Sequence, residues 1–237
     1  MTTETLSKPT TPARVESRTK PPLYEFCRLP VPIEYPDSDG QPMAESDFQF
    51  EPLVYSIQAL KFHFRDRPDV YVSGNILFYY EEGQPTEVVA PDVFVVIGAA
   101  KHKRRFYKLW EEPKAPDFVL EITSRWTRSK DQGTKFGLYQ FLGVTEYFCY
   151  GPTGDYLDPP LVGYRLKEGR YVSIPPKEVT PTSIVVSSEI VGLDLRAEGS
   201  EFRFVAPVAS SELRGLAEAE VRIRELEAQL ATMRTQE

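Results

Sequence analysis

The chain has few of the residues that build disulfide frameworks, zinc sites and nucleophilic triads. Its 237 residues include two cysteines and two histidines. Cys27 and Cys149 are too few for a disulfide framework or a zinc site. Neither His63 nor His102 lies near a nucleophile elbow or a cysteine motif, which argues against a hydrolase that pairs Ser or Cys with His.

Long hydrophobic runs are also missing. No apolar stretch approaches the roughly 20 residues that a membrane-spanning helix needs. The N-terminal residues contain no apolar core of a secretory signal, so we expect a cytoplasmic protein. A glycine-rich phosphate loop ending in Gly-Lys-Ser/Thr is missing as well.

Positive charge is in deficit, because 28 Lys and Arg residues face 35 Asp and Glu residues and give a net charge of -7. This balance argues against a protein that coats DNA non-specifically, which needs a basic surface. It does not exclude a nuclease, because a metal-binding site is itself acidic. The stretch "KHKRR", residues 101–105, forms either a local basic rim or an ordinary solvated loop.

Composition divides the chain into three parts. Residues 1–45 are rich in Thr, Pro, Ser and charged residues, which predicts a disordered or extended arm. Residues 46–208 mix helical and strand patterns, which predicts one α/β (α+β) domain with C-terminal hairpins. Residues 209–237 show the alternating three- and four-residue apolar steps of a coiled coil, at Leu216, Ala219, Ile223, Leu226, Leu230 and Met233. We expect this helix to join two chains as a homodimer; the alternative is an amphipathic helix packed on its own domain.

Within the central domain, hydrophobic spacing predicts the order of the elements. A helix over 52–66 precedes strands near 70–80, 92–97 and 118–122. A helix over 129–141 then leads into a strand near 145–151, and hairpins follow over 161–174 and 193–205. The strands near 92–97 and 118–122 are almost continuously apolar, which indicates a sheet covered on both faces.

A carboxylate lies at the end of each of these two apolar strands. Asp92 precedes the first strand, and Glu121 follows the apolar run of the second. Singly, each is the kind of residue that is solvated or caps a backbone donor. If the strands are neighbours, both carboxylates converge at one sheet edge. Two close carboxylates repel unless a cation lies between them, and hard oxygen ligands suit Mg²⁺ or Mn²⁺.

The helix over 129–141 adds a positive charge to this pattern. Asp131, Lys135 and Tyr139 are spaced i, i+4 and i+8, which places them on one face of an α-helix. A lysine beside a metal-bound water can position or deprotonate it, or stabilise the charge that develops on a phosphate. The simpler interpretation is a surface Asp–Lys pair with Tyr139 packed beside it.

The ordered motifs resemble those of the Uma2 family of restriction-endonuclease-like proteins, within the PD-(D/E)XK nuclease superfamily. The resemblance covers about residues 50–208. The matching positions are Pro91, Asp92, Glu121, Ser124, Asp131, Lys135, Tyr139, Gly143, Val144, Glu146 and Tyr147. It implies a restriction-endonuclease-like mixed sheet with flanking helices and a Mg²⁺- or Mn²⁺-dependent endonuclease that cuts DNA.

The resemblance also implies roles for individual residues. Asp92 and Glu121 would bind the metal, with the backbone carbonyl of Ile122 as a third ligand, and Lys135 would assist the attacking water. Ser124, Asp131 and Tyr139 would support these residues.

Three positions depart from the family pattern. The superfamily lysine that follows the glutamate by two residues is replaced here by Thr123, so the likeness implies that Lys135 stands in for it. Arg125 follows Ser124 where relatives have proline. The first helix offers only Gln58 as a polar candidate near the metal. The departures leave open a catalytically inactive binding or assembly protein with a nuclease fold.

Overall fold

The computed structural model describes residues 33–38, 46–124, 130–155 and 157–207, and only the backbone of residues 130–132. The elements described below belong to one compact unit, Tyr35–Glu237. Most of the predicted arm (1–45) and all of the predicted coiled coil (209–237) lie outside the described residues. The predicted homodimer therefore stays a prediction.

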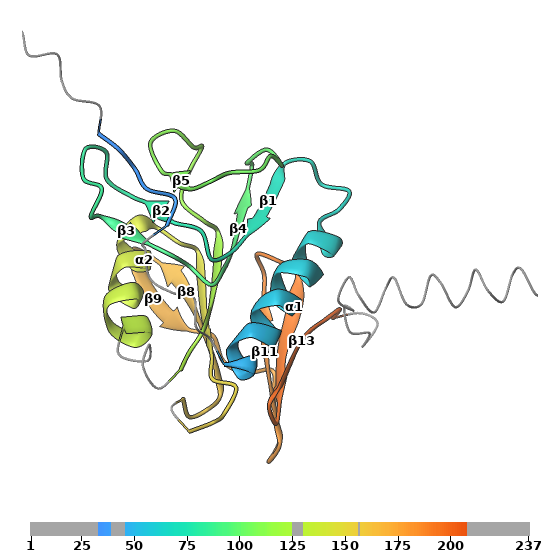
Figure 1. The fold of residues 1–237 in the computed structure, drawn as a ribbon. Coiled ribbons are helices and arrows are strands. Elements are labelled where there is room, and N and C mark those ends of the chain that lie inside the picture. Colours follow the sequence, from blue (N-terminus) through green and yellow to red (C-terminus); the bar gives the residue numbers. More distant parts are fainter. Residues whose placement is uncertain (1–32, 39–45, 125–129, 156, 208–237) are drawn as a thin grey trace, which may run out of the picture. The chain divides into compact units, whose positions relative to one another are not determined.

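The domain contains few helices and many short strands (Figure 1). The helical segments are α1 (Asp47–His63), the π-helical segment η2 (Lys130–Lys135) and α2 (Phe136–Leu142). The first strands are β1 (Val70–Ser73), β2 (Phe78–Tyr79), β3 (Val88–Val89), β4 (Val93–Ile97), β5 (Tyr107–Lys108), β6 (Phe118–Ile122) and β7 (Glu146–Tyr150). The later strands are β8 (Leu161–Lys167), β9 (Arg170–Ser173), β10 (Glu178–Val179), β11 (Ser183–Ser188), β12 (Leu193–Glu198) and β13 (Glu201–Val205). No helix in the described ranges has both the length and the apolar character to span a membrane.

A mixed six-stranded sheet with the order β1-β4-β6-β7-β8-β9 forms the centre of the domain. Only β6 and β7 are parallel in this sheet, and η2 and α2 make the crossover between them. A parallel pair needs such a crossover because a tight hairpin cannot join its ends. A four-stranded antiparallel sheet, β10-β11-β12-β13, and a small sheet, β3-β2-β5, complete the fold. The prediction of a mixed α/β domain is confirmed.

The central sheet separates two hydrophobic cores, because successive side chains of a strand point to opposite faces. The first core combines residues of α1 and of β11–β13 with one face of the sheet, including Val93, Val95, Phe118, Leu120 and Ile122. The second core combines Tyr139 of α2 and residues of β2 and β5 with the other face, including Phe94, Val119, Tyr147 and Cys149. Figure 1 shows α1 beside β11 and β13, and α2 on the side of β8 and β9. The expectation of a sheet covered on both faces holds, and the Cys149 thiol is buried in the second core.

The strand predicted near 70–80 is in fact two strands in different sheets. β1 ends at Ser73 and β2 begins at Phe78. Between them Asn75 adopts a positive φ of 52°, which a strand does not allow, and its N–H donates to the Pro91 carbonyl 2.8 Å away. Ser73, Gly74 and Asn75 interrupt the apolar residues on either side, and Gly and Asn favour turns, so the sequence contains a signal for this break that the predicted strand did not use.

The predicted helices also differ from the observed ones. α1 begins at Asp47, before the expected start at Pro52, and it ends at His63. The helix predicted over 129–141 is π-helical from Lys130 to Lys135 and α-helical only from Phe136. A π-helix has a wider turn than an α-helix. The spacing that predicted Asp131 and Lys135 on one α-helical face therefore does not apply there.

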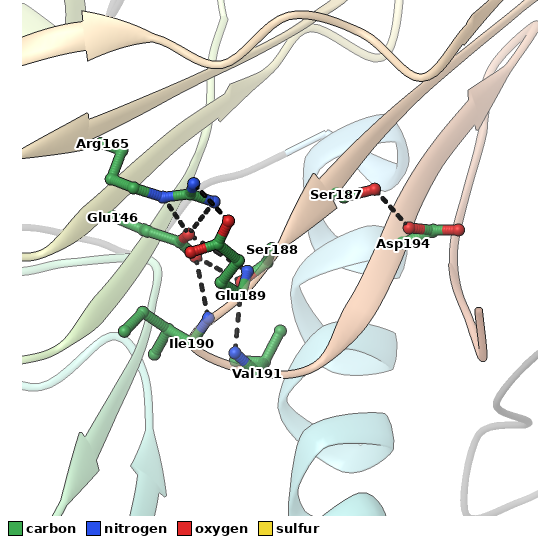
Figure 2. Close-up of polar contacts among 8 residues, drawn as sticks. All are labelled: Glu146, Arg165, Ser187, Ser188, Glu189, Ile190, Val191 and Asp194. Carbon is green, nitrogen blue, oxygen red and sulfur yellow. Dashed lines mark hydrogen bonds and ion pairs between the residues drawn. The ribbon is translucent and has the colours of Figure 1, made fainter. Parts of the chain in front are cut away.

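A buried carboxylate, Glu146 at the start of β7, fastens the four-stranded sheet to the central sheet (Figure 2). Its Oε1 accepts hydrogen bonds from Arg165 Nε (3.0 Å) and from the N–H of Glu189 (3.1 Å). Its Oε2 accepts from the Ser188 hydroxyl and from the N–H of Ile190 (3.3 Å). The turn between β11 and β12 thus closes around this one side chain.

The helix α1 joins the same turn through His63. Its Nε2 lies 3.0 Å from the carbonyl oxygen of Val191. Burial lowers the pKa of His63 from its usual value. A neutral ring can still donate this hydrogen bond if its proton lies on Nε2.

We expect Glu146→Gln to destabilise the protein by about 2–4 kcal/mol. The amide NH₂ would replace one oxygen that accepts hydrogen bonds, and the negative charge opposite Arg165 would be lost. The matched control is Glu189→Gln. Glu189 pairs with the same Arg165, at 2.6 Å, but its side chain is 74% exposed. That control should change stability by less than about 0.5 kcal/mol. Urea unfolding followed by tryptophan fluorescence measures both; equal losses in the two variants would contradict the fastening role.

Candidate active site

Asp92 and Glu121 lie opposite each other on neighbouring antiparallel strands. β4 and β6 pair Val93 with Leu120, so extending this register by one residue sets Asp92 against Glu121. Phe94 and Val119 belong to the second core, and alternation assigns Asp92 and Glu121 to this same face of the sheet. Directly opposed residues in such a pair have their Cβ atoms about 4.5–5.5 Å apart. The two acidic residues predicted to converge are therefore neighbours.

Glu121 is a fully buried carboxylate with a polar partner at each oxygen. Its side chain is 0% exposed. The Tyr139 hydroxyl donates to Oε1 at 2.7 Å, and Lys135 Nζ donates to Oε2 at 2.7 Å. Burying a charge is costly unless it is paired and hydrogen-bonded, and these two contacts meet that requirement. The crossover η2–α2 supplies both donors, which fixes it over this end of β6.

Asp92 is held in place by the backbone of β6. Its Oδ2 accepts the N–H of Ile122 at 2.7 Å. Asp92 thus caps a backbone donor, which is one of the two roles expected for a carboxylate at a strand end. It also brings the Asp92 carboxylate to the residue that follows Glu121, so a structural bond and a shared site are compatible.

A second Pro-Asp pair provides an internal comparison for Asp92. Asp117 follows Pro116 and precedes β6, and its Oδ2 accepts the N–H of Ile97, at the end of β4, at 2.8 Å. Each aspartate thus bonds the last N–H of the partner strand. The difference lies in their surroundings: Asp117 pairs with Lys114 at 2.5 Å at the opposite end of the β4–β6 pair. Only Asp92 lies beside the buried Glu121.

Thr123 lies two residues after Glu121, at the position where the sequence resemblance led us to look for a lysine. Its side chain lies on the same face as Glu121 by strand alternation, and the residue is 1% exposed. Its Oγ1 is buried and makes no hydrogen bond to any residue that the structure describes. A buried hydroxyl without a partner is unfavourable, which marks a place where a water or ligand oxygen would be stabilised.

The other predicted residues lie at different distances from this group. Ser124 follows β6 and is half-buried. Gln58 is half-buried on α1, whose buried side chains enter the first core, on the opposite face of the sheet. The side chain of Asp131 lies outside the described residues. The structure thus joins Asp92, Glu121, Lys135 and Tyr139, and the supporting roles of the other three stay predictions.

The donors at this site suit a hard divalent cation. Each carboxylate oxygen has two lone pairs, so an oxygen that accepts one hydrogen bond can still bind a metal. Asp92 and Glu121 together supply the two charges that Mg²⁺ sites in proteins commonly use, with water and phosphate completing the shell. The described residues contain no cluster of three or more His, Cys, Asp or Glu side chains that could hold a metal. A metal here would therefore rest on two carboxylates and backbone oxygen.

Comparisons with known proteins agree with the motifs. The family model for Uma2, with the description "Putative restriction endonuclease", matches residues 23–198. A crystal structure titled as a "putative nuclease belonging to DUF820", from Anabaena variabilis ATCC 29413, is 14% identical, covers 67% of this chain and 87% of its own, and has a TM-score of 0.43. No curated protein matches the chain. The structural likeness is too distant to support an argument, so the relationship rests on the family match.

We expect Gly74→Ala to disturb the site, because a Cβ at Gly74 would lie 2.0 Å from the Asp92 carbonyl oxygen and 2.8 Å from Ile57 Cδ1. The backbone before β4 would have to move, at a cost of about 1–3 kcal/mol. Gly137→Ala is the matched control, since its Cβ would meet nothing within 4 Å on α2. This control should stabilise by up to about 1 kcal/mol. Urea unfolding compares the two; the same sign for both would contradict the close approach at Gly74.

Proposed function

The chain belongs to the Uma2 family, as its motifs predicted, and from this membership we propose that it is a divalent-metal-dependent endonuclease that hydrolyses DNA phosphodiester bonds. The observation that carries the proposal is the buried Glu121, which lies opposite Asp92 and contacts both Lys135 and Tyr139. Two carboxylates and one ammonium group around a divalent metal would be a sufficient set for phosphodiester cleavage.

The residues of the site would divide the work. Asp92 and Glu121 would hold Mg²⁺ or Mn²⁺, together with the backbone carbonyl of Ile122. Such an ion supplies a bound water of lowered pKa and neutralises charge on a phosphate oxygen. Tyr139 keeps the Glu121 carboxylate in one orientation through its 2.7 Å hydrogen bond.

Lys135 would assist the attacking water. Its ammonium lies 2.7 Å from Glu121, and its side chain is 18% exposed, so it is reachable from solvent. From this position it can donate to the water or stabilise the negative charge that grows on the phosphate oxygens. Ser124 and Asp131 would support this arrangement.

A second candidate function is a binding or assembly protein that keeps the nuclease fold without catalysis. The observation that favours it is the Lys135–Glu121 ion pair, which already neutralises the Glu121 carboxylate without a metal. The two functions differ in one respect that can be measured: only the nuclease needs Asp92 to carry a charge.

We expect Asp92→Asn to reduce metal-dependent nicking of plasmid DNA at least ~100-fold and to remove Mn²⁺ uptake in calorimetry. Stability should stay unchanged or rise slightly, since the asparagine oxygen can still accept the Ile122 N–H while the charge repulsion with Glu121 disappears. Chelation of the metal with EDTA should abolish wild-type nicking.

Asp117→Asn is the control for Asp92→Asn. It makes the same chemical change in the same Pro-Asp context and retains an acceptor for the Ile97 N–H. Nicking by this variant should equal that of the wild type. A wild-type protein that neither nicks DNA nor takes up metal, under varied salt and metal, would leave the binding protein as the function.

We expect Lys135→Ala to lose activity, by about 100-fold, while the double variant Lys135→Ala/Thr123→Lys recovers part of it. The recovery follows from geometry, because position 123 lies on the face of Glu121 and a lysine there occupies the superfamily position. The matched control is Lys135→Ala/Thr123→Met, which supplies a long side chain without charge. Initial nicking rates measure the set; a Lys135→Ala variant as active as the wild type would reduce Lys135 to a structural partner.

A further inference from the structure

A groove of about 450 Å³ runs along the outer edge of β1, and its lining includes none of the residues of the candidate active site. Its lining consists of one residue of α1, the whole of β1 and part of the loop before β5. The lining residues are Lys61, Val70, Tyr71, Val72, Ser73, Lys101, His102, Lys103 and Arg104.

The charge of this groove is opposite to that of the chain. Its lining includes four Lys or Arg residues, a histidine and no carboxylate, whereas the chain as a whole has a net charge of -7. A concave surface with one sign of charge raises the local concentration of ligands of the other sign. The groove therefore suits an anionic ligand.

Two of the basic residues build the walls of the groove. Lys101 donates from Nζ to the carbonyl oxygens of Phe64 and Arg65, beyond the last residue of α1. It thereby neutralises a helix end that would otherwise repel an anion. Arg104 lies 4.0 Å above the ring of Tyr71 and forms a two-point ion pair with Glu112, at 2.6 and 2.8 Å. These contacts fix the loop before β5 against β1.

The remaining basic residues point their charge to solvent. Lys61, His102 and Lys103 are exposed. Among the described residues no carboxylate forms an ion pair with Lys61 or Lys103. A bound anion would therefore meet two ammonium groups without displacing an existing partner, on walls that are already fixed.

The strand itself adds one neutral donor. β1 is the edge of the central sheet and pairs only with β4 there. Every second residue of an edge strand directs its N–H and C=O away from the sheet, which here are Val70 and Val72 because Asp69 accepts the N–H of Gly98. The Val70 N–H donates to the Arg67 carbonyl, so the Val72 N–H is the outward donor that can bind a phosphate oxygen. Two exposed lysines beside this donor suit a chain of phosphates better than a single anion.

One end of the groove leads to the candidate active site. Ser73 lines the groove, and the next residue, Gly74, lies against the Asp92 carbonyl oxygen. The four residues of β1 span about 10 Å, at roughly 3.3 Å per step. Only a few phosphates of one DNA strand fit over that length.

We propose that this groove binds the phosphodiester backbone of DNA and directs it along β1 toward Asp92 and Glu121. The proposal rests on the nuclease function proposed above for its substrate, although DNA binding by the groove needs neither metal nor cleavage. Lys61 and Lys103 are the phosphate contacts, and Lys101 and Arg104 are positioning residues of the walls.

The test measures DNA binding by the full chain in EDTA, so that cleavage does not contribute. Fluorescence anisotropy with a labelled duplex of about 30 base pairs gives Kd from 50 to 200 mM salt. The logarithm of the association constant falls linearly as log salt rises, and each lost phosphate contact should make this dependence less steep by about 0.9. We expect Lys61→Gln/Lys103→Gln to reduce the magnitude of the slope by nearly two and to weaken binding about tenfold at low salt.

The control is Lys167→Gln/Arg170→Gln, which removes the same charge from the exposed hairpin of β8 and β9, at the other edge of the sheet. Its slope and Kd should stay within about twofold of the wild type. Equal effects of the two double variants would overturn the proposal, because net charge alone would then govern binding.

A competition assay separates DNA from an acidic protein segment. Poly-glutamate of matched charge should compete for the groove at least ten times less well than unlabelled duplex. Equal competition would overturn the assignment to DNA. These outcomes are independent of the nuclease proposal, which fails if the wild type neither nicks DNA nor takes up metal, or if Asp92→Asn leaves nicking unchanged.

Discussion

The buried charge of Glu121 is the constraint on which the rest of the site depends. A carboxylate with no exposed surface at the end of an apolar strand requires donors on both oxygens. Lys135 and Tyr139 meet this requirement, and both come from the crossover between the parallel strands β6 and β7. The Glu121 side chain therefore accounts for several features of the crossover. These are its position, the π-helical geometry at its start and the approach of an ammonium group to the sheet edge.

The domain buries a second carboxylate, and the comparison explains why only one is a candidate for chemistry. Glu146 accepts hydrogen bonds from Arg165, from the Ser188 hydroxyl and from two backbone N–H groups (Figure 2). Its lone pairs are filled by fixed groups, which suits a fastening role. The partners of Glu121 include two side chains of the crossover, Tyr139 and Lys135, and its neighbour on the adjacent strand is Asp92. Glu121 is therefore the buried carboxylate that we propose for metal binding.

Local patterns predicted the strands β4 and β6 and the meeting of Asp92 with Glu121, because consecutive apolar strands tend to be neighbours. The parts that the sequence did not predict depend on contacts distant in the chain. The close approach of Gly74 to Asp92 needed the pairing of β1 with β4, and the role of Glu146 follows from a turn more than forty residues later. The residues "KHKRR" could not reveal that Lys101 and Arg104 would be fixed in a wall while Lys103 stays exposed. The equivalence of the Asp92 and Asp117 strand-end bonds also needed the register of β4 and β6.

The presence of Thr123 on the strand, with the ammonium group supplied by Lys135 instead, has a consequence for how the site can move. A lysine on the strand would share the rigidity of the central sheet, whereas Lys135 lies at the end of a π-helical segment. Its ammonium nevertheless reaches Glu121 at 2.7 Å. The same charge is thus brought to the same carboxylate from a different backbone position, and the strand position is left with a buried hydroxyl that has no partner among the described residues. A π-helical turn departs from regular backbone geometry and is found often at functional sites, and here it ends at the lysine whose ammonium group pairs with Glu121.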